Sequence, residues 1–207
     1  SLLYIHLKGG GIDGGKGALD AEEIVSWGGV VSDLQSGFLR DFEVRDGVTT
    51  FSGTNGFAGN LDVIGGEVRA DRDFSFSRNI KTTASGSGVL NFLGYQQRID
   101  DVEVFENGRM YVEESNPFEA DTIRLRSSSL LTRNPGGIVV SLQKGEQAPI
   151  EVNKNLIFEK GSLVMKAPLT DEPEGAWKII SGPIENVGEL AENAFLMVDD
   201  GSHAVFN

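Results

Sequence analysis

Acidic side chains are the part of this sequence with the greatest capacity for chemistry. Three pairs of carboxylates border expected strands: Asp71 and Asp73, Asp100 and Asp101, and Glu113 and Glu114. Neighbouring carboxylates can act as general acid and base in glycoside cleavage, or can bind calcium together. The first and third pairs follow strands that lie two repeats apart in similar phase, which predicts that they share one face. The alternative is that all three pairs lie in solvated turns.

Histidine and phosphate-loop chemistry have little support in the sequence. His6 lies within an apolar run, where we expect a hydrogen-bonded structural role, and His203 is expected at the surface. The segment Gly9–Gly17 resembles a phosphate loop, but Lys16 is followed by Gly17 instead of the serine or threonine of the Walker motif. We therefore expect a mobile loop or terminal arm there. No catalytic residue, metal ligand or cofactor site is assigned.

Composition limits the partners and the compartment. The chain has 31 Asp and Glu against 18 Lys and Arg, a net charge of −13, which disfavours nucleic acid and anionic lipid as partners. No apolar run reaches the roughly 18 residues that a membrane helix needs. The absence of cysteine excludes disulfide bonds, thiol nucleophiles and thiolate zinc sites. The start within a strand pattern, without methionine, indicates a processed product or a piece of a longer protein.

Short strands separated by glycine turns must position these side chains. The 27 glycines among 207 residues are nearly twice the usual share of about 7%. The turn glycines Gly47, Gly66, Gly88 and Gly108 are separated by 19, 22 and 20 residues. This interval predicts an all-β fold, a right-handed parallel β-helix with rungs of about 20 residues. The alternative is an antiparallel β-sandwich, because Asp-Gly and Asn-Gly pairs also favour hairpins.

The alternation within the strands predicts the core and the domain organisation. Seven phenylalanines alternate in phase with aliphatic residues and are expected to stack inside: Phe42, Phe51, Phe74, Phe76, Phe92, Phe105 and Phe158. Few aromatic residues are then left for the surface, so no sugar-stacking platform is expected. Residues 1–40 are expected to hold a strand, the glycine-rich loop and a short helix or cap, and 41–207 the solenoid, closing from about 168. The segment Asp20–Trp27 fits a two-turn helix or a strand equally well.

One segment carries the order of a known repeat. Residues 50–70 resemble the autotransporter-associated β-strand repeat at nine positions: Phe51, Ser52, Gly53, Asn55, Phe57, Gly59, Val63, Gly66 and Val68. Asn60 and Leu61 depart from its usual small polar pair. Residues 175–181 and 195–201 are similar to strands that close autotransporter passengers. The resemblance implies a right-handed parallel β-helix in an exported bacterial surface protein that acts as a stalk, adhesin or scaffold, and it supplies no catalytic residues.

Three functional hypotheses follow from these patterns. The leading one is a structural or adhesive β-helical segment of an exported bacterial surface protein, located outside the cell and without catalytic activity of its own. Its partners would be a host or matrix surface glycan or protein. The second is a polysaccharide-binding or polysaccharide-cleaving β-helix that uses carboxylates such as Asp71, Asp73 or Glu113. The third is a self-assembling module that pairs through the ends of the solenoid, where strand edges are exposed.

Overall fold

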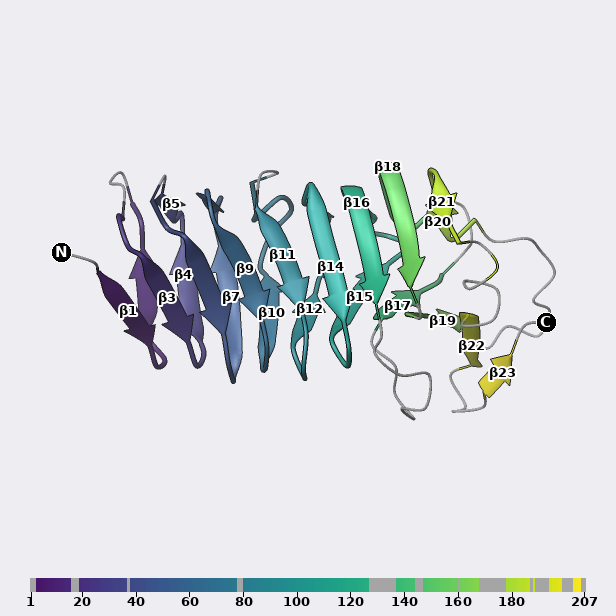
Figure 1. The fold of residues 1–207 in the computed structure, drawn as a ribbon, viewed down its shortest axis with the longest axis horizontal. Coiled ribbons are helices and arrows are strands. Elements are labelled where there is room, and N and C mark those ends of the chain that lie inside the picture. Colours follow the sequence, from purple (N-terminus) through teal and green to yellow (C-terminus); the bar gives the residue numbers. More distant parts are fainter. Residues whose placement is uncertain are drawn as a thin grey trace.

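The computed structural model describes residues 3–15, 19–36, 38–77, 80–126, 137–143, 147–159, 161–167, 178–186, 188, 194–198 and 203–205. The chain winds into a β-solenoid of about 7 turns, with successive turns about 21 residues apart. Its strands lie side by side from the N-terminal end of the molecule to the C-terminal end (Figure 1). Within the described residues, no helix has the length and apolar character needed to cross a membrane.

Two long sheets and one short sheet make up the walls of the solenoid. The first sheet contains β1 (Tyr4–Leu7), β3 (Glu23–Ser26), β6 (Asp41–Val44), β9 (Asn60–Val63), β11 (Lys81–Ala84), β13 (Gln97–Arg98), β14 (Asp101–Phe105), β16 (Phe118–Arg126), β18 (Ile150–Glu159), β20 (Ile180–Ser181) and β21 (Ile184–Glu185). The second sheet contains β2 (Gly11–Asp13), β4 (Gly29–Ser32), β7 (Val48–Ser52), β10 (Glu67–Ala70), β12 (Val89–Asn91), β15 (Arg109–Glu113), β17 (Gly137–Ser141), β19 (Ser162–Ala167), β22 (Ala194–Val198) and β23 (His203–Val205). The short sheet pairs β5 (Gln35–Ser36) with β8 (Gly56–Phe57).

Strands of successive turns pair in parallel, and each residue lies next to its counterpart in the preceding turn. Ile24 pairs with Phe42, Phe42 pairs with Leu61, and all three side chains are fully buried. From β1 to β4 and from β6 to β7, each strand and the next one in the sequence belong to different long sheets, so they do not form hairpins. The predicted parallel β-helix is therefore confirmed, and the alternative of an antiparallel sandwich is wrong. Among the described strands, only β22 and β23 pair antiparallel.

Stacked glycines mark the corner where each turn passes from the first sheet to the second. Gly47, Gly66, Gly88 and Gly108 each lie at or just before a strand of the second sheet, as their interval predicts. A Cβ atom at Gly88 would lie 1.8 Å from the Val63 carbonyl oxygen of the turn below. Glycine is therefore required here because neighbouring backbones approach too closely for any side chain.

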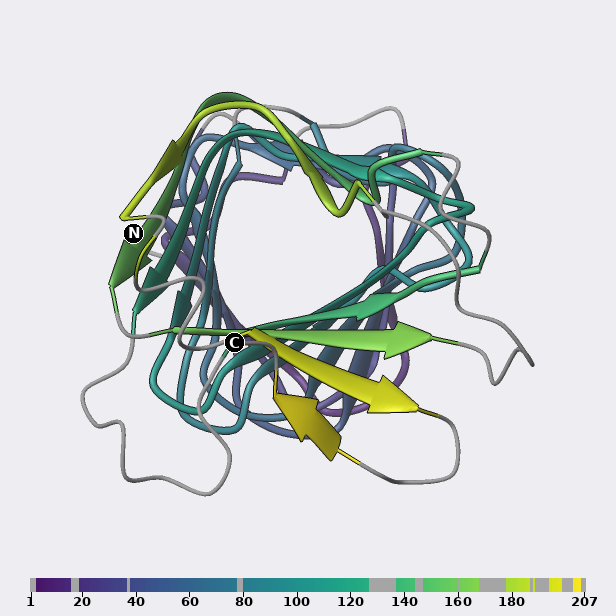
Figure 2. The ribbon, with the colours of Figure 1, turned by 90° about the vertical axis from the view of Figure 1, so that its right-hand side faces the viewer.

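The walls of the solenoid enclose an interior in the view along the stack (Figure 2). Buried phenylalanine rings contact one another from turn to turn in the core. Neighbouring ring centroids lie 5.2 Å apart between Phe42 and Phe51, 4.9 Å between Phe51 and Phe76, 6.0 Å between Phe76 and Phe92, and 5.4 Å between Phe92 and Phe118. Such contacts add about 0.5–1.5 kcal/mol per pair beyond area burial. Five of the seven phenylalanines predicted for the core are buried: Phe42, Phe51, Phe76, Phe92 and Phe158.

Two of the predicted core phenylalanines face outward. Phe74 is 48% exposed, because it lies in a turn where the alternation of a strand does not apply. Phe105 is half-buried, with the Arg126 guanidinium 5.4 Å from its ring centroid. The prediction that these two rings belong to the core is wrong.

The N-terminal region forms turns of the same solenoid. Glu23–Ser26 is strand β3, paired with β1 and β6, so the strand alternative holds and the helix does not. Gly11–Asp13 is strand β2, which starts the second sheet instead of belonging to a loop. His6 is exposed on the outer face, where its ring meets Trp27 edge-on at 5.3 Å, so the expectation of a hydrogen-bonded histidine in an apolar setting is not met.

The C-terminal strands close the second sheet. Met197 pairs antiparallel with His203, which lies in β23. Of the two segments similar to passenger-closing strands, residues 178–181 and 195–198 fall within the described part of the chain, and they include β20 and most of β22. Residues 175–177 and 199–201 lie outside the described residues.

Candidate functional site

The turns that follow the second sheet bring together two of the three predicted acid pairs. Asp71 and Asp73 follow β10, and Glu113 and Glu114 lie at the end of β15. Strand β12 lies between β10 and β15, so these acids line one corner of the solenoid, two turns apart. Asp71, Asp73 and Glu113 therefore share a face, as predicted, whereas the fourth acid, Glu114, is buried. Two sheet spacings correspond to about 10 Å, and the side chain of Leu93 belongs to the turn between them.

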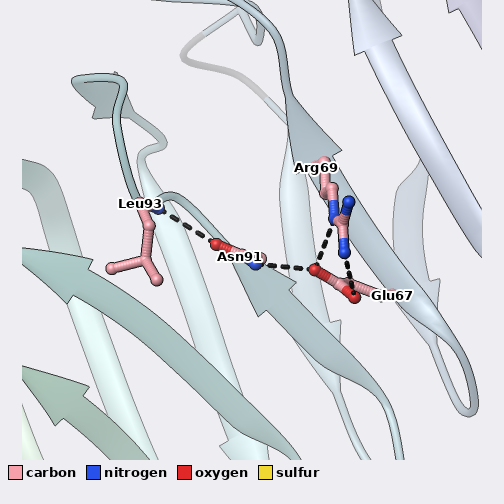
Figure 3. Close-up of polar contacts among 4 residues, drawn as sticks. All are labelled: Glu67, Arg69, Asn91 and Leu93. Carbon is pink, nitrogen blue, oxygen red and sulfur yellow. Dashed lines mark hydrogen bonds and ion pairs between the residues drawn. The ribbon is translucent and has the colours of Figure 1, made fainter.

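Side-chain acceptors from three turns hold the intervening turn, residues 93–96. The Asn91 Oδ1 atom accepts from the Leu93 backbone N–H at 3.1 Å (Figure 3). Glu113 Oε1 accepts from the Gly94 N–H at 2.8 Å, and Asp73 Oδ1 accepts from the Gln96 N–H at 2.8 Å. Charge-assisted hydrogen bonds of this kind are about twice as strong as neutral ones. Asp73 and Glu113 therefore serve as braces between neighbouring turns.

An ion pair between Glu67 and Arg69 on the outer face of β10 orients the Asn91 side chain. The Arg69 guanidinium donates to Glu67 through Nε at 2.6 Å and through a terminal nitrogen at 3.0 Å (Figure 3). Asn91 Nδ2 donates to Glu67 Oε1 at 2.6 Å, which orients its carbonyl oxygen toward the Leu93 N–H. The pKa of Glu67 is lowered, first by the hydrogen bond from Arg69 and then by that from Asn91, although partial burial opposes the shift.

The preceding turn, residues 71–77, is braced by the buried amide of Gln97. Its Oε1 atom accepts from the Ser75 N–H at 2.9 Å, and its Nε2 atom donates to the Arg72 carbonyl at 2.7 Å. The Phe74 N–H donates to the Gln96 carbonyl at 2.8 Å, which joins this turn to the next. These bonds hold Phe74 at φ +55°, a strained conformation for a bulky residue that costs about 1–3 kcal/mol.

The two braced turns display three apolar side chains at the surface. Phe74 is 48% exposed, Leu93 is 41% exposed and Tyr95 is 38% exposed. We call these three side chains the platform. Sequence reasoning missed the platform because Phe74 was assigned to the core, and because the bond between Phe74 and Gln96 joins residues of different turns. The positive φ of a phenylalanine has no signal in the sequence.

The other predicted acids do not join the platform. The Asp100 carbonyl accepts from the N–H groups of Asp121 and Thr122 at 2.9 Å each, and Asp101 begins β14 of the first sheet. Glu114 is buried, and its Oε2 atom accepts from the Gln143 N–H at 2.8 Å. In the part of the chain that the structure describes, no three acidic or histidine side chains group closely enough to hold a metal ion.

A shallow hollow of about 310 Å³ lies on the outer face of the first sheet. Its lining combines the acids Asp101 and Glu103 with the bases Lys81 and Arg124. The neighbouring Asp62 has a raised pKa, chiefly because partial burial penalises its charged form, while a hydrogen bond from Thr83 opposes the shift. All but one of the residues that line the hollow are polar or charged, and the exception, Val102, is buried.

Two carboxylates and the exposed apolar side chains meet at the turn of residues 93–96. Asp73 and Glu113 each accept a hydrogen bond from a backbone N–H of residues 93–96, and the exposed rings offer apolar contact.

Comparisons with known proteins found no relative. A scan against protein-family models gave no match, and searches of curated proteins and of solved structures gave none either.

Proposed function

We propose that this chain is a structural or adhesive β-helical segment of an exported bacterial surface protein, without catalytic activity of its own. The observation that supports this most is the platform, three exposed apolar side chains held on braced turns of a continuous solenoid. A solenoid in which each turn contacts its neighbours gives an extended surface for binding. The acidic surface, with a net charge of −13, suits a soluble surface structure that repels nucleic acid.

Surface location is tested on cells that make the whole protein. An antibody raised against the folded chain is applied to intact cells and to permeabilised cells, with an antibody against a cytoplasmic protein as the control. We expect strong labelling of intact cells by the first antibody only. Labelling that appears only after permeabilisation would contradict the proposal.

The absence of catalysis is tested with polysaccharides, because the acids of the corner would act on glycosidic bonds if they acted at all. The purified chain is incubated with acidic and neutral polysaccharides, with and without calcium, and newly formed chain ends are measured. We expect no release above the background. Release that Asp71→Asn or Glu113→Gln abolishes would assign the chain to the enzymes instead.

A further inference from the structure

Phe74 combines two unfavourable features that the fold does not need. Its ring is 48% exposed to water, and its backbone is held at φ +55°. A strained residue persists only where surrounding bonds over-determine it, and such residues concentrate at functional sites. The bonds made by Asp73, Gln96 and Gln97 provide that constraint. A glycine at position 74 would adopt this φ without strain and would expose no ring.

Hydrogen bonds hold the backbone under the platform in a defined conformation without a ligand. Leu93 and Tyr95 lie on the turn whose N–H groups are bonded by Asn91, Glu113 and Asp73. Ordering side chains and loops on binding costs free energy, and a surface that is already ordered avoids that cost. An exposed apolar group on a fixed turn is therefore suited to a weak ligand of defined shape.

The size of the platform points to a small ligand unit. Each of its three side chains is less than half exposed, whereas a stable protein interface buries about 800 Å² on each partner. Three partly exposed side chains match the face of one or two sugar rings much better than they match a folded protein. Aromatic rings such as those of Phe74 and Tyr95 suit an amphipathic ligand that has an apolar face and polar edges.

The charges around the platform select a ligand without negative charge. Asp71, Arg72 and Asp73 belong to the turn that carries Phe74. Asp73 and Glu113 bond the turn that carries Leu93 and Tyr95, so the acids of these turns outnumber the one cation. Ionised carboxylates only accept hydrogen bonds, so they favour hydroxyl donors and repel acidic groups. Asp71 is exposed three residues before Phe74, so its oxygens are accessible to hydroxyl groups.

From these observations we infer that the platform binds a neutral saccharide, which lays its apolar face on Phe74 and Tyr95 and donates hydroxyl hydrogens to Asp71 and Glu113. This inference rests on the proposed adhesive function and names its ligand class. It departs from the sequence prediction that the chain has no sugar-stacking platform.

The test uses affinity electrophoresis of the full chain in gels that contain one polysaccharide each. The neutral probes are dextran, galactomannan and xyloglucan, and the acidic probe is polygalacturonate. We expect at least one neutral polysaccharide to retard the chain and polygalacturonate to leave its mobility unchanged. No retardation by any neutral probe, or retardation by polygalacturonate alone, would overturn the inference.

Variants assign the binding to the platform. Tyr95→Ala and Phe74→Gly are each expected to weaken binding at least tenfold. Phe38→Ala is the matched control, because Phe38 is 77% exposed on another turn, and it should bind like the parent. Retardation that is equal in Tyr95→Ala, Phe74→Gly and the parent would contradict the assignment.

Thermal melting distinguishes a ligand-binding ring from a structural one. Phe74→Gly removes the strained φ along with the ring, so its melting temperature should not fall below that of the parent. A fall of several degrees would mean that the ring stabilises the fold, and would contradict the inference even if binding were lost.

Failure of this inference is separable from failure of the proposed function. If intact cells are labelled but no neutral polysaccharide binds, the surface function stands and the ligand class is wrong. If the purified chain binds a neutral polysaccharide through Tyr95 but intact cells are not labelled, the ligand class stands and the surface location is wrong.

Discussion

Two carboxylates of this protein, Glu67 and Asp62, have pKa values that are shifted in opposite directions. Glu67 is stabilised in its charged form by Arg69 and Asn91, which lowers its pKa. Asp62 is penalised in its charged form by burial and by the nearby carboxylates Asp41 and Glu43, which raises its pKa. The two residues therefore affect stability with opposite dependence on pH.

Glu67→Gln should destabilise the protein near neutral pH. The substitution weakens the bonds to Arg69 and Asn91, and we expect a loss of about 1 kcal/mol, or about 2–4 °C in melting temperature. The folded-state pKa lies below the usual value of 4.5, so the stabilisation is present above that pH and is lost as the pH falls through the folded pKa. Melting curves at pH 7 and pH 3 test this. Exposed Glu151→Gln is the control, and a gap between parent and Glu67→Gln that grows on acidification would contradict the prediction.

Asp62→Asn should stabilise the protein at neutral pH. The raised pKa means that the charged carboxylate is less stable in the folded chain than in the unfolded chain. We expect a melting temperature higher by about 1–3 °C at pH 7. The gain should disappear as the pH falls below the ordinary aspartate pKa, where the carboxyl is protonated in both states. A loss of stability at pH 7, measured in the same melting series, would show that the Thr83 hydrogen bond outweighs burial.

At the scale of elements, alternating strands bury one set of side chains and glycine corners let neighbouring turns stack closely. Each strand turns alternate side chains inward, as in β6, where Phe42 and Val44 are buried between half-buried neighbours. Each corner then lets the backbone pass close to the turn below, as at Gly88 over Val63. Because this contact is repeated along the stack, a single side chain at the corner displaces two turns.

Gly88→Ala should be severely destabilising. Its Cβ atom would lie 1.8 Å from the Val63 carbonyl oxygen, so the two backbones must separate and their hydrogen bonds are lost, at a cost of about 3 kcal/mol or more. Gly11→Ala is the matched control, because the nearest atom to its Cβ, the Val30 carbonyl oxygen, lies at an ordinary 3.5 Å. Urea unfolding of both variants measures the difference. Equal midpoints would contradict the stacked corner.

The regular elements were predictable from the sequence, and the site was only partly so. The interval between glycines and the alternation of buried residues such as Phe42 predict the solenoid, because every turn has the same close backbone approach at its corner and the same inward-facing positions. Asp73 and Glu113 were predicted to share a face, since they follow strands in similar phase. Their role as braces was not, because it depends on bonds to Gly94 and Gln96 in another turn. Phe74 was misplaced because a turn interrupts the strand alternation.

At the scale of the whole molecule, every feature of the site depends on the order in which turns stack. The platform exists because the turn of residues 93–96 lies between the turn of residues 71–77 and the end of β15. This neighbourhood follows from the parallel pairing of β12 with β10 on one side and β15 on the other. A different order of strands would separate Phe74 from Tyr95 and leave the acids of the corner unrelated.

Engineered disulfide bonds test this order most directly, because the chain has no cysteine of its own. Val89 pairs with Arg109 in the adjacent turn, and the strand spacing of about 4.8 Å lies within the Cα separation that a disulfide tolerates. Val48 and Val89 flank Glu67 on opposite sides, two turns apart, which is about 10 Å and too far. On mild oxidation, Val89→Cys with Arg109→Cys should lose both free thiols, and Val48→Cys with Val89→Cys should keep both. Free thiols in the first variant, or a bond within the second, would contradict the stacked solenoid and the site built on it.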